Sequence, residues 1–301
     1  MRHRPVKSLD AKIAAHSHLL LVPEKDARPV TLAAAPQSIS PQEDRHAVLP
    51  CEAEAPKESH PGRWYERETP RYVIPEDFAH APVFVEFGCG KGDFINALAV
   101  SPEADRIGAL MIGVEGGGSI VLAALRKTAD AGLTNVRYIN HYVNDAAAAF
   151  APASIDGIFL NFSDPWPKDR HADRRLTSPS KAAAYFCVLK PGGFAVMKTD
   201  GRPLYEYSLE TFRAAGFTIV YQTEDLSAAP AIPGATQPMA IIGAATSVIP
   251  TAAAATSVIP GAAPGSTQPM AIIGAATQTE YERRFRGLGC PISCFIAIRS
   301  A

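Results

Sequence analysis

Between residues 82 and 222, short apolar runs alternate with stretches whose apolar positions recur every three or four residues. The apolar runs have the length of strands buried on both faces, and the periodic stretches are typical of amphipathic helices. This alternation predicts an α/β domain with a mostly parallel central sheet and helices on both faces. The predicted strands are Val83–Phe87, Ala109–Val114, Val136–Asn140, Ile158–Phe162, Phe194–Lys198 and Thr218–Gln222. The predicted helices are Leu9–His18, Asp93–Val100, Ile120–Ala131, Ala146–Phe150, Ser178–Leu189 and Leu204–Ala215.

The chain on either side of this pattern is less regular. Residues 1–80 are polar and rich in Pro, which predicts an N-terminal extension that is partly irregular. Residues 227–278 contain no charged residue, and Thr236–Thr246 recurs identically at Thr267–Thr277. Two copies are too few for a stacked repeat, so the composition predicts a mobile insertion without a catalytic role, with a partner-binding arm as the alternative. The catalytic domain is then expected over 81–226 and 279–301.

Composition narrows the class of protein. The chain has 29 Lys and Arg against 30 Asp and Glu, so it does not bind nucleic acid by bulk charge. Its five cysteines include no C-x-x-C pair, which fits a reducing cytosol and a cytoplasmic location. No apolar run approaches the ~18 residues of a membrane span. The eight His residues show no ligand spacing with Cys or acids, so no metal is expected.

A glycine-rich loop follows the first predicted strand as Glu86-x-Gly88-x-Gly90-x-Gly92. A strand, a glycine turn and a helix start form a corner that can hold a nucleotide. Asp93 stands where a dinucleotide fingerprint has its third glycine, which argues against a nicotinamide dehydrogenase. The preceding acid favours a cationic cofactor such as S-adenosylmethionine. Glu115 ends the next strand, where a carboxylate can accept from ribose hydroxyls.

The segment 161–168, Asn-Phe-Ser-Asp-Pro-Trp-Pro-Lys, follows the fourth predicted strand. Its two prolines stiffen the loop and leave Asp164 at the strand end, on the cofactor side. Trp166 offers an aromatic face, either for stacking on a base or for packing the loop. Residues 168–175 carry four positive charges against two negative ones, which favours contacts with phosphates.

These motifs resemble those of the bacterial tRNA (guanine-N7-)-methyltransferases, which have a Rossmann-like class I methyltransferase fold. The resemblance covers residues 1–23, 62–64, 82–226 and 278–298 and runs through V-E-F-G-C-G-K-G, I-G-V-E, L-N-F-S-D-P-W-P-K, R-R-L-T, L-K-P-G-G, K-T-D and T-E-Y-E. It implies methyl transfer from S-adenosylmethionine to N7 of guanine 46 in the tRNA variable loop. Monomer and homodimer both stay open.

The resemblance also implies roles for individual residues. The cofactor-binding residues are Glu86, Gly88, Gly90, Glu115, Tyr142 and Asp164, with Asp164 also catalytic. The substrate-binding residues are Lys168, Asp200, Thr279 and Glu282, joined by Arg170, Arg174 and Arg175 of the basic run. Tyr142 occupies the position that meets the adenine, where the family has an acid or amide; Asn140, Asn144 and Asp145 are the alternatives.

Guanine N7 carries a lone pair and no proton, so no general base is needed. We expect Asp164 to stabilise the positive charge that develops on the base; the alternative is that Asp164 fixes the cofactor and Asp200 reads the base. A methyltransferase for another RNA or a small molecule is the first competing hypothesis. The second is a non-catalytic RNA-binding relative, favoured by the insertion, by Tyr142, and by Asp169 and Asp173 where the family has Lys.

Overall fold

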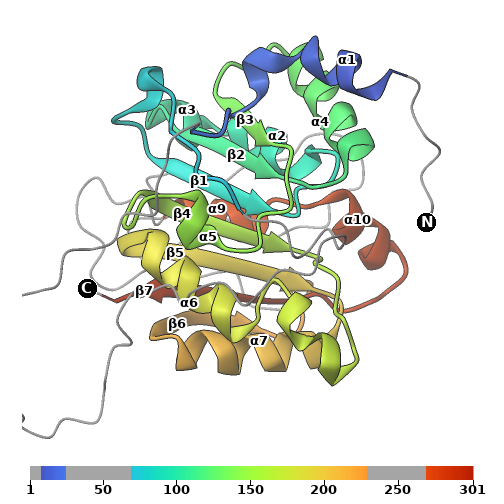
Figure 1. Ribbon diagram of the computed structural model, residues 1–301. Helices are drawn as coiled ribbons and strands as arrows, with labels where there is room; N and C mark the ends of the chain where they lie inside the picture. Colours follow the sequence, from blue (N-terminus) through green and yellow to red (C-terminus); the bar gives the residue numbers. More distant parts are fainter. Residues whose placement is uncertain (1–7, 25–68, 229–268, 301) are drawn as a thin grey trace, which may run out of the picture.

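The computed structural model describes residues 8–24, 69–228 and 269–300 of the 301-residue chain. These residues form a seven-stranded sheet with a helical layer on each face (Figure 1). The expectations for residues 1–7, 62–64 and 229–268 lie outside the described residues. Within the described part of the chain, every helix is too short or too polar to cross a membrane.

The strand order of the sheet is β3-β2-β1-β4-β5-β7-β6, and β7 alone runs antiparallel to its neighbours. All residues of β1, β2 and β4 are buried, as their predominantly apolar character predicts. This order, with the antiparallel strand next to the edge, confirms the expected class I methyltransferase fold. The strands are β1 Val83–Phe87, β2 Leu110–Val114, β3 Val136–Ile139, β4 Ile155–Asn161, β5 Leu189–Thr199, β6 Phe217–Thr223 and β7 Ser293–Arg299.

An apolar core lies between each face of the sheet and the helices that cover it. One face packs against α2, α3, α4 and α9, and the other against α5, α6 and α7. The helices are α1 Leu9–Ala14, α2 Asp93–Ala99, α3 Pro102–Arg106, α4 Gly118–Asp130, α5 Ala146–Ala149, α6 Pro179–Val188, α7 Arg202–Ala214, α9 Pro269–Ala276 and α10 Glu280–Gly287. Short 3₁₀ turns occupy Ser17–Leu19, Glu76–Phe78 and Asp169–Arg174.

Two parts of the expected N-terminal extension dock onto the domain. Helix α1 packs against α4, and Ile13 is buried there. The amide of Leu21 donates to the carbonyl of Tyr138 on β3 at 2.9 Å, and the amide of Tyr72 donates to that of Ala149 at 2.8 Å. Residues 8–24 and 69–80 therefore belong to the packed domain rather than to an irregular extension.

The second copy of the repeated sequence is a core helix, which corrects the expected insertion boundary at residue 278. Helix α9 lies within this copy and contacts β4, β5 and β7. Its residues Met270, Ala271, Ile272, Ile273 and Ala275 are at most 1% exposed. A helix buried on all sides is apolar all round, so its composition resembles that of a low-complexity segment. The first copy lies outside the described residues.

Gly274 lets α9 approach the sheet, because a Cβ there would overlap the ring of Phe159. We expect Gly274→Val to lower the free energy of unfolding by about 1–3 kcal/mol, the usual cost of overpacking a core. Urea unfolding measures this loss. The matched control is Gly287→Val, at an exposed glycine where a Cβ would meet no atom within 4 Å, and it is expected within about 0.5 kcal/mol of wild type. Equal losses in both variants would contradict this assignment.

Candidate functional site

The glycine loop after β1 is built for close approach of a ligand. Gly88, Gly90 and Gly92 have φ values of 75°, 54° and 76°, in the left-handed region that side chains disfavour. The amides of Gly88 and Cys89 both donate to the carbonyl of Val114, which holds the loop against the end of β2. A Cβ on Gly90 would meet no atom within 4 Å. The loop is therefore fixed at its base and open at Gly90.

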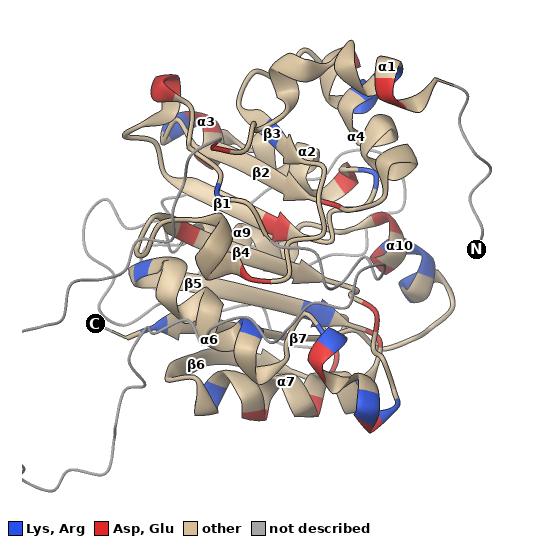
Figure 2. Ribbon diagram, in the orientation of Figure 1, with Lys and Arg blue, Asp and Glu red and all other residues tan. Residues whose placement is uncertain are grey.

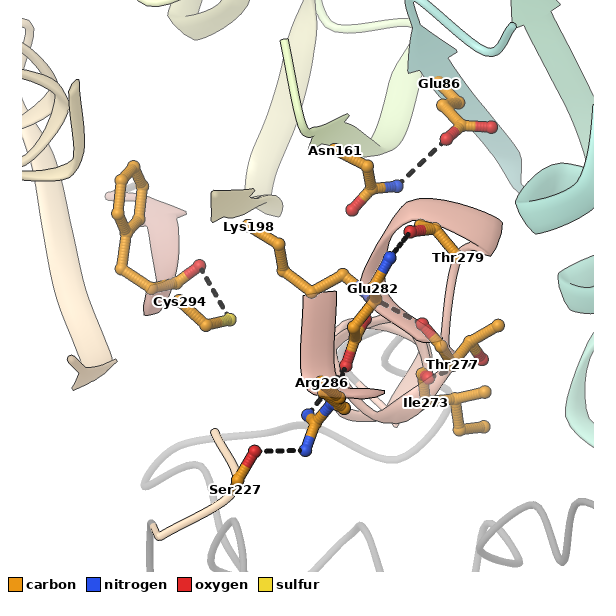
Figure 3. A network of polar contacts seen from close by, with 11 residues as sticks. Glu86, Asn161, Lys198, Ser227, Ile273, Thr277, Thr279, Glu282, Arg286 and Cys294 are labelled. Carbon is orange, nitrogen blue, oxygen red and sulfur yellow. Dashed lines mark hydrogen bonds and ion pairs between the residues drawn. The ribbon is translucent and has the colours of Figure 1, made fainter. Parts of the chain in front are cut away.

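Glu86 is a carboxylate held in the sheet with only one oxygen paired. It is 2% exposed, and its Oε1 accepts from Nδ2 of Asn161 at 2.9 Å (Figure 3). Burial raises the pKa of Glu86 to about 8, although the Asn161 hydrogen bond and the nearby Lys198 ammonium act to lower it. Burial thus favours the protonated form of Glu86, and an approaching cation would favour the ionised form.

Unpaired acceptors gather where β1 and β4 end. Five buried side-chain polar atoms in the described chain lack a hydrogen-bond partner. Three of them, Glu86 Oε2, Asn161 Oδ1 and Ser163 Oγ, belong to these two neighbouring strands and the loop after β4. Buried acceptors without donors are costly, so they point to a ligand that supplies donors. The ammonium and sulfonium of S-adenosylmethionine are cationic, and this set of oxygens fits them.

Glu115 follows β2 at the same edge of the sheet. Its Oε1 accepts from the amide of Gly117 at 2.8 Å, and the side chain is partly exposed. The ring of Tyr142 lies directly over Gly116, where any Cβ would collide with it. Among the alternatives for the adenine contact, Asp145 instead caps α5 by accepting from the amide of Ala147 at 2.8 Å. Tyr142 is therefore the candidate that lies beside Glu115.

The loop after β4 is braced in a strained conformation. Phe162 and Trp166 have φ values of 50° and 40°, which is costly for side chains of this size. The Arg175 guanidinium donates to the carbonyls of Pro165 and Trp166 at 3.1–3.3 Å. Asp164 lies within this braced segment and is exposed. The loop thus presents a carboxylate in a defined place at the strand ends.

Two residues of the basic run serve the loop itself. Arg175 braces the loop and lies 4.4 Å from the ring centroid of Tyr207. Its guanidinium is therefore engaged within the protein, and its contact with a phosphate stays a prediction. Arg174 lies 5.1 Å from the ring centroid of Trp166, which also meets the ring of His171 edge-on. Trp166 thus packs within the loop, and its stacking on a base stays a prediction.

The exposed cations are Lys168 and Arg170 in the basic run, with Asp169 and Asp173 exposed among them. Helix α10 adds exposed Arg283 and Arg284, which the sequence analysis did not identify. Figure 2 shows blue segments on α10 and at the start of α7, and red at the end of β1. Asp200 is exposed directly after β5. Exposed cations therefore lie in the basic run and on α10, interspersed with exposed carboxylates.

Thr279 and Glu282 lie at the start of α10 but are buried. Thr279 caps the helix, with its Oγ1 accepting from the amide of Glu282 at 2.9 Å. The Glu282 carboxylate is fully buried; one oxygen meets Lys198 at 2.9 Å and the other meets Arg286 at 2.7 Å. In this arrangement both carboxylate oxygens are engaged inside the protein, away from a substrate.

The sequence analysis missed Asn161, Ser163 and Lys198 as parts of the site. All three lie within the motifs L-N-F-S-D-P-W-P-K and K-T-D, so their place in these motifs could have identified them as site residues. What only the structure shows is that the side chains of Asn161 and Lys198, and the Oγ atom of Ser163, are buried at the strand ends. In the described ranges, no three His, Cys, Asp or Glu side chains gather as metal ligands would.

The chain is similar in sequence to known methyltransferases. A protein-family profile described as "Putative methyltransferase" matches residues 80–238. The tRNA (guanine-N(7)-)-methyltransferase of Geobacillus kaustophilus is 38% identical over 169 residues, which span 52% of this chain and 76% of that protein. The protein of the same name from Mesoplasma florum is 41% identical over 152 residues, or 48% and 66% of the two chains. The crystal structure of the antibiotic-resistance methyltransferase Kmr is 15% identical, with a TM-score of 0.43, over 76% of this chain and 95% of that one.

Binding of S-adenosylmethionine is expected to depend on pH through Glu86. The cationic ligand favours ionised Glu86, whose pKa is about 8 in the free protein, so binding below pH 8 releases a proton. The dissociation constant should therefore fall by up to about tenfold for each pH unit from 6 to 7.5. Calorimetric titration at several pH values measures it.

Two variants control this measurement. Glu86→Gln should bind weakly and without this pH dependence, because it has no carboxyl to ionise. Glu115→Gln should bind more weakly but keep the slope, because Glu86 is intact. A wild-type dissociation constant that is level from pH 6 to 7.5 would contradict the role of Glu86.

Proposed function

Since the chain belongs to the tRNA (guanine-N7-)-methyltransferase family, we propose that it transfers the methyl group of S-adenosylmethionine to N7 of guanine 46, in the variable loop of tRNA. The observation that carries the proposal is the juxtaposition of two features at one edge of the sheet. Buried unpaired acceptors end β1 and β4, and an exposed carboxylate, Asp164, follows three residues after Asn161. The buried acceptors suit a cationic methyl donor, and Asp164 suits a base that becomes cationic when it is methylated.

S-adenosylmethionine supplies an electrophilic methyl group on its sulfonium when bound. Glu86 and Asn161 would accept from its ammonium group, because their free oxygens Oε2 and Oδ1 are buried and unpaired. Glu115 would accept from the ribose hydroxyls, and the open face of Gly90 would admit the ligand backbone. We assign Tyr142 to the adenine, since its ring lies over Gly116 beside Glu115.

Catalysis in this site is mainly orientation. The lone pair of guanine N7 attacks without losing a proton, so the protein contributes alignment, which can be worth about 7–11 kcal/mol. Asp164 would accept from the N1–H or exocyclic amine of the guanine and stabilise the charge that develops on the purine. The braced loop holds this carboxylate through Arg175 and the carbonyls of Pro165 and Trp166.

Phosphates of the tRNA would be held by the exposed cations beside the site. Lys168 and Arg170 come from the basic run, and Arg283 and Arg284 come from α10. These contacts position the RNA but carry no sequence information. Their number is small, in keeping with a net charge of -1 for the whole chain. We therefore expect the choice of guanine to depend on the pocket near Asp164.

The target base can be mapped directly. We expect the purified protein to transfer tritiated methyl groups to unmodified tRNA, and borohydride and aniline treatment to cleave the product at guanine 46 alone. A transcript with adenine at position 46 is the matched control and should accept no label. Cleavage at another guanine would contradict the assigned position. Label on other RNA or on a small molecule alone, or none at all despite cofactor binding, would favour the competing hypotheses.

Replacing Asp164 tests the catalytic assignment. Asp164→Asn keeps the shape of the side chain but removes its charge, so we expect the single-turnover rate at saturating S-adenosylmethionine to fall by about 10²-fold or more. Asp169→Asn is the matched control, since Asp169 is an exposed carboxylate five residues further along the same segment. It should methylate at the wild-type rate. Wild-type turnover by Asp164→Asn would refute the role of Asp164 and leave Asp200 as the residue to test.

A further inference from the structure

Lys198 is a fully buried lysine near the end of β5. Its Nζ donates to the carbonyl of Thr277 at 2.5 Å and to the carboxylate of Glu282 at 2.9 Å (Figure 3). The ammonium also lies 5.1 Å from the ring centroid of Phe94. A buried ammonium is costly unless it is paired and hydrogen-bonded, and removing its partner is strongly destabilising. These contacts therefore fix the end of α9 and the start of α10 against β5.

The same residue also holds the loop that carries Asp164. Lys198 pairs with Asn161 across the sheet, and its carbonyl accepts from the amide of Phe162 at 2.8 Å. Phe162 is the first residue after β4 and stands two residues before Asp164. Lys198 thus contacts the catalytic loop through its backbone and α10 through its side chain.

Helix α10 and this loop meet through three aromatic rings. Phe162 stacks on Tyr281 with ring centroids 6.4 Å apart at 21°, and on Phe285 at 6.2 Å and 13°. Tyr281 is 58% exposed, so part of its ring remains open to solvent beside the loop. An exposed ring packed against the loop that carries Asp164 is the type of surface on which an unstacked base binds.

We propose that Lys198 is a positioning residue for tRNA methylation, which holds α10 in register so that Tyr281 stacks on the purine brought to Asp164. The inference rests on the proposed function. It gives Glu282 a part in substrate binding without direct contact: the carboxylate anchors the helix, and Tyr281 beside it meets the base. Direct contact of Glu282 with RNA would leave the Lys198 ammonium buried without its counterion.

The sharpest variant is Glu282→Gln, which keeps the side-chain shape and the helix cap but removes the charge that meets Lys198. We expect the KM for tRNA to rise by about tenfold or more, while kcat changes less and the dissociation constant for S-adenosylmethionine stays within about twofold. Lys198→Met should show the same rise in KM. Lys190→Met is the matched control: Lys190 pairs with Asp156 at 2.7 Å at the beginning of the same strand, and its variant should keep the wild-type KM.

Hydrogen exchange separates this inference from the proposed function, because it needs no turnover. In Glu282→Gln the amides of 280–287 should exchange at least about tenfold faster than in wild type, with β1 and β4 unchanged. This measurement on Glu282→Gln tests the positioning role even if Lys198→Met does not fold. Unchanged exchange in α10 together with a wild-type KM would overturn the positioning role. Faster exchange in α10 of a protein whose wild type does not methylate tRNA would support the anchor and refute the proposed function.

Discussion

The site depends on a carboxylate that the fold leaves half satisfied. Glu86 is buried in the middle of the sheet, with one oxygen bound to Asn161 and the other without a partner. Burial is the main cause that raises its pKa to about 8, despite a nearby ammonium. This arrangement lowers the free energy of unfolding, because an unsatisfied buried acceptor is costly. The cost is explained if a cationic ligand binds the unpaired oxygen of Glu86.

Two groups of polar contacts lie on neighbouring strands at this edge of the sheet. Asn161 on β4 donates to Glu86, and its register partner Lys198 on β5 pairs with Glu282, which also pairs with Arg286. The pairing of β4 with β5 therefore places the cofactor end of the site beside the helix that adjoins the substrate end (Figure 3). Within the second group the Glu282 carboxylate lies between the Lys198 and Arg286 cations, so opposite charges compensate for burial. This explains why residues far apart in the sequence occupy a single edge of the sheet.

The sequence predicted those parts of the molecule that local pattern determines. Val83–Phe87 is a strand as predicted, since a short run that is apolar apart from Glu86 and lies between turn residues has few alternatives. Helix α9 was missed because it is apolar all round and has an identical copy earlier in the chain, so no local feature distinguishes the two. The burial of Glu282 was equally hidden, because its counterion Lys198 stands 84 residues earlier. Likewise, the bracing of the loop by Arg175 depends on loop geometry that charge counting does not contain.

The most direct test is the protonation state of Glu86 before and after S-adenosylmethionine binds. Infrared difference spectroscopy at pH 7 detects the C=O stretch of a protonated carboxyl group. We predict that this band is present in the free protein, disappears when the cofactor binds, and is absent from the difference spectrum of Glu86→Gln. A wild-type spectrum without loss of a protonated carboxyl, or one identical to that of Glu86→Gln, would contradict the account.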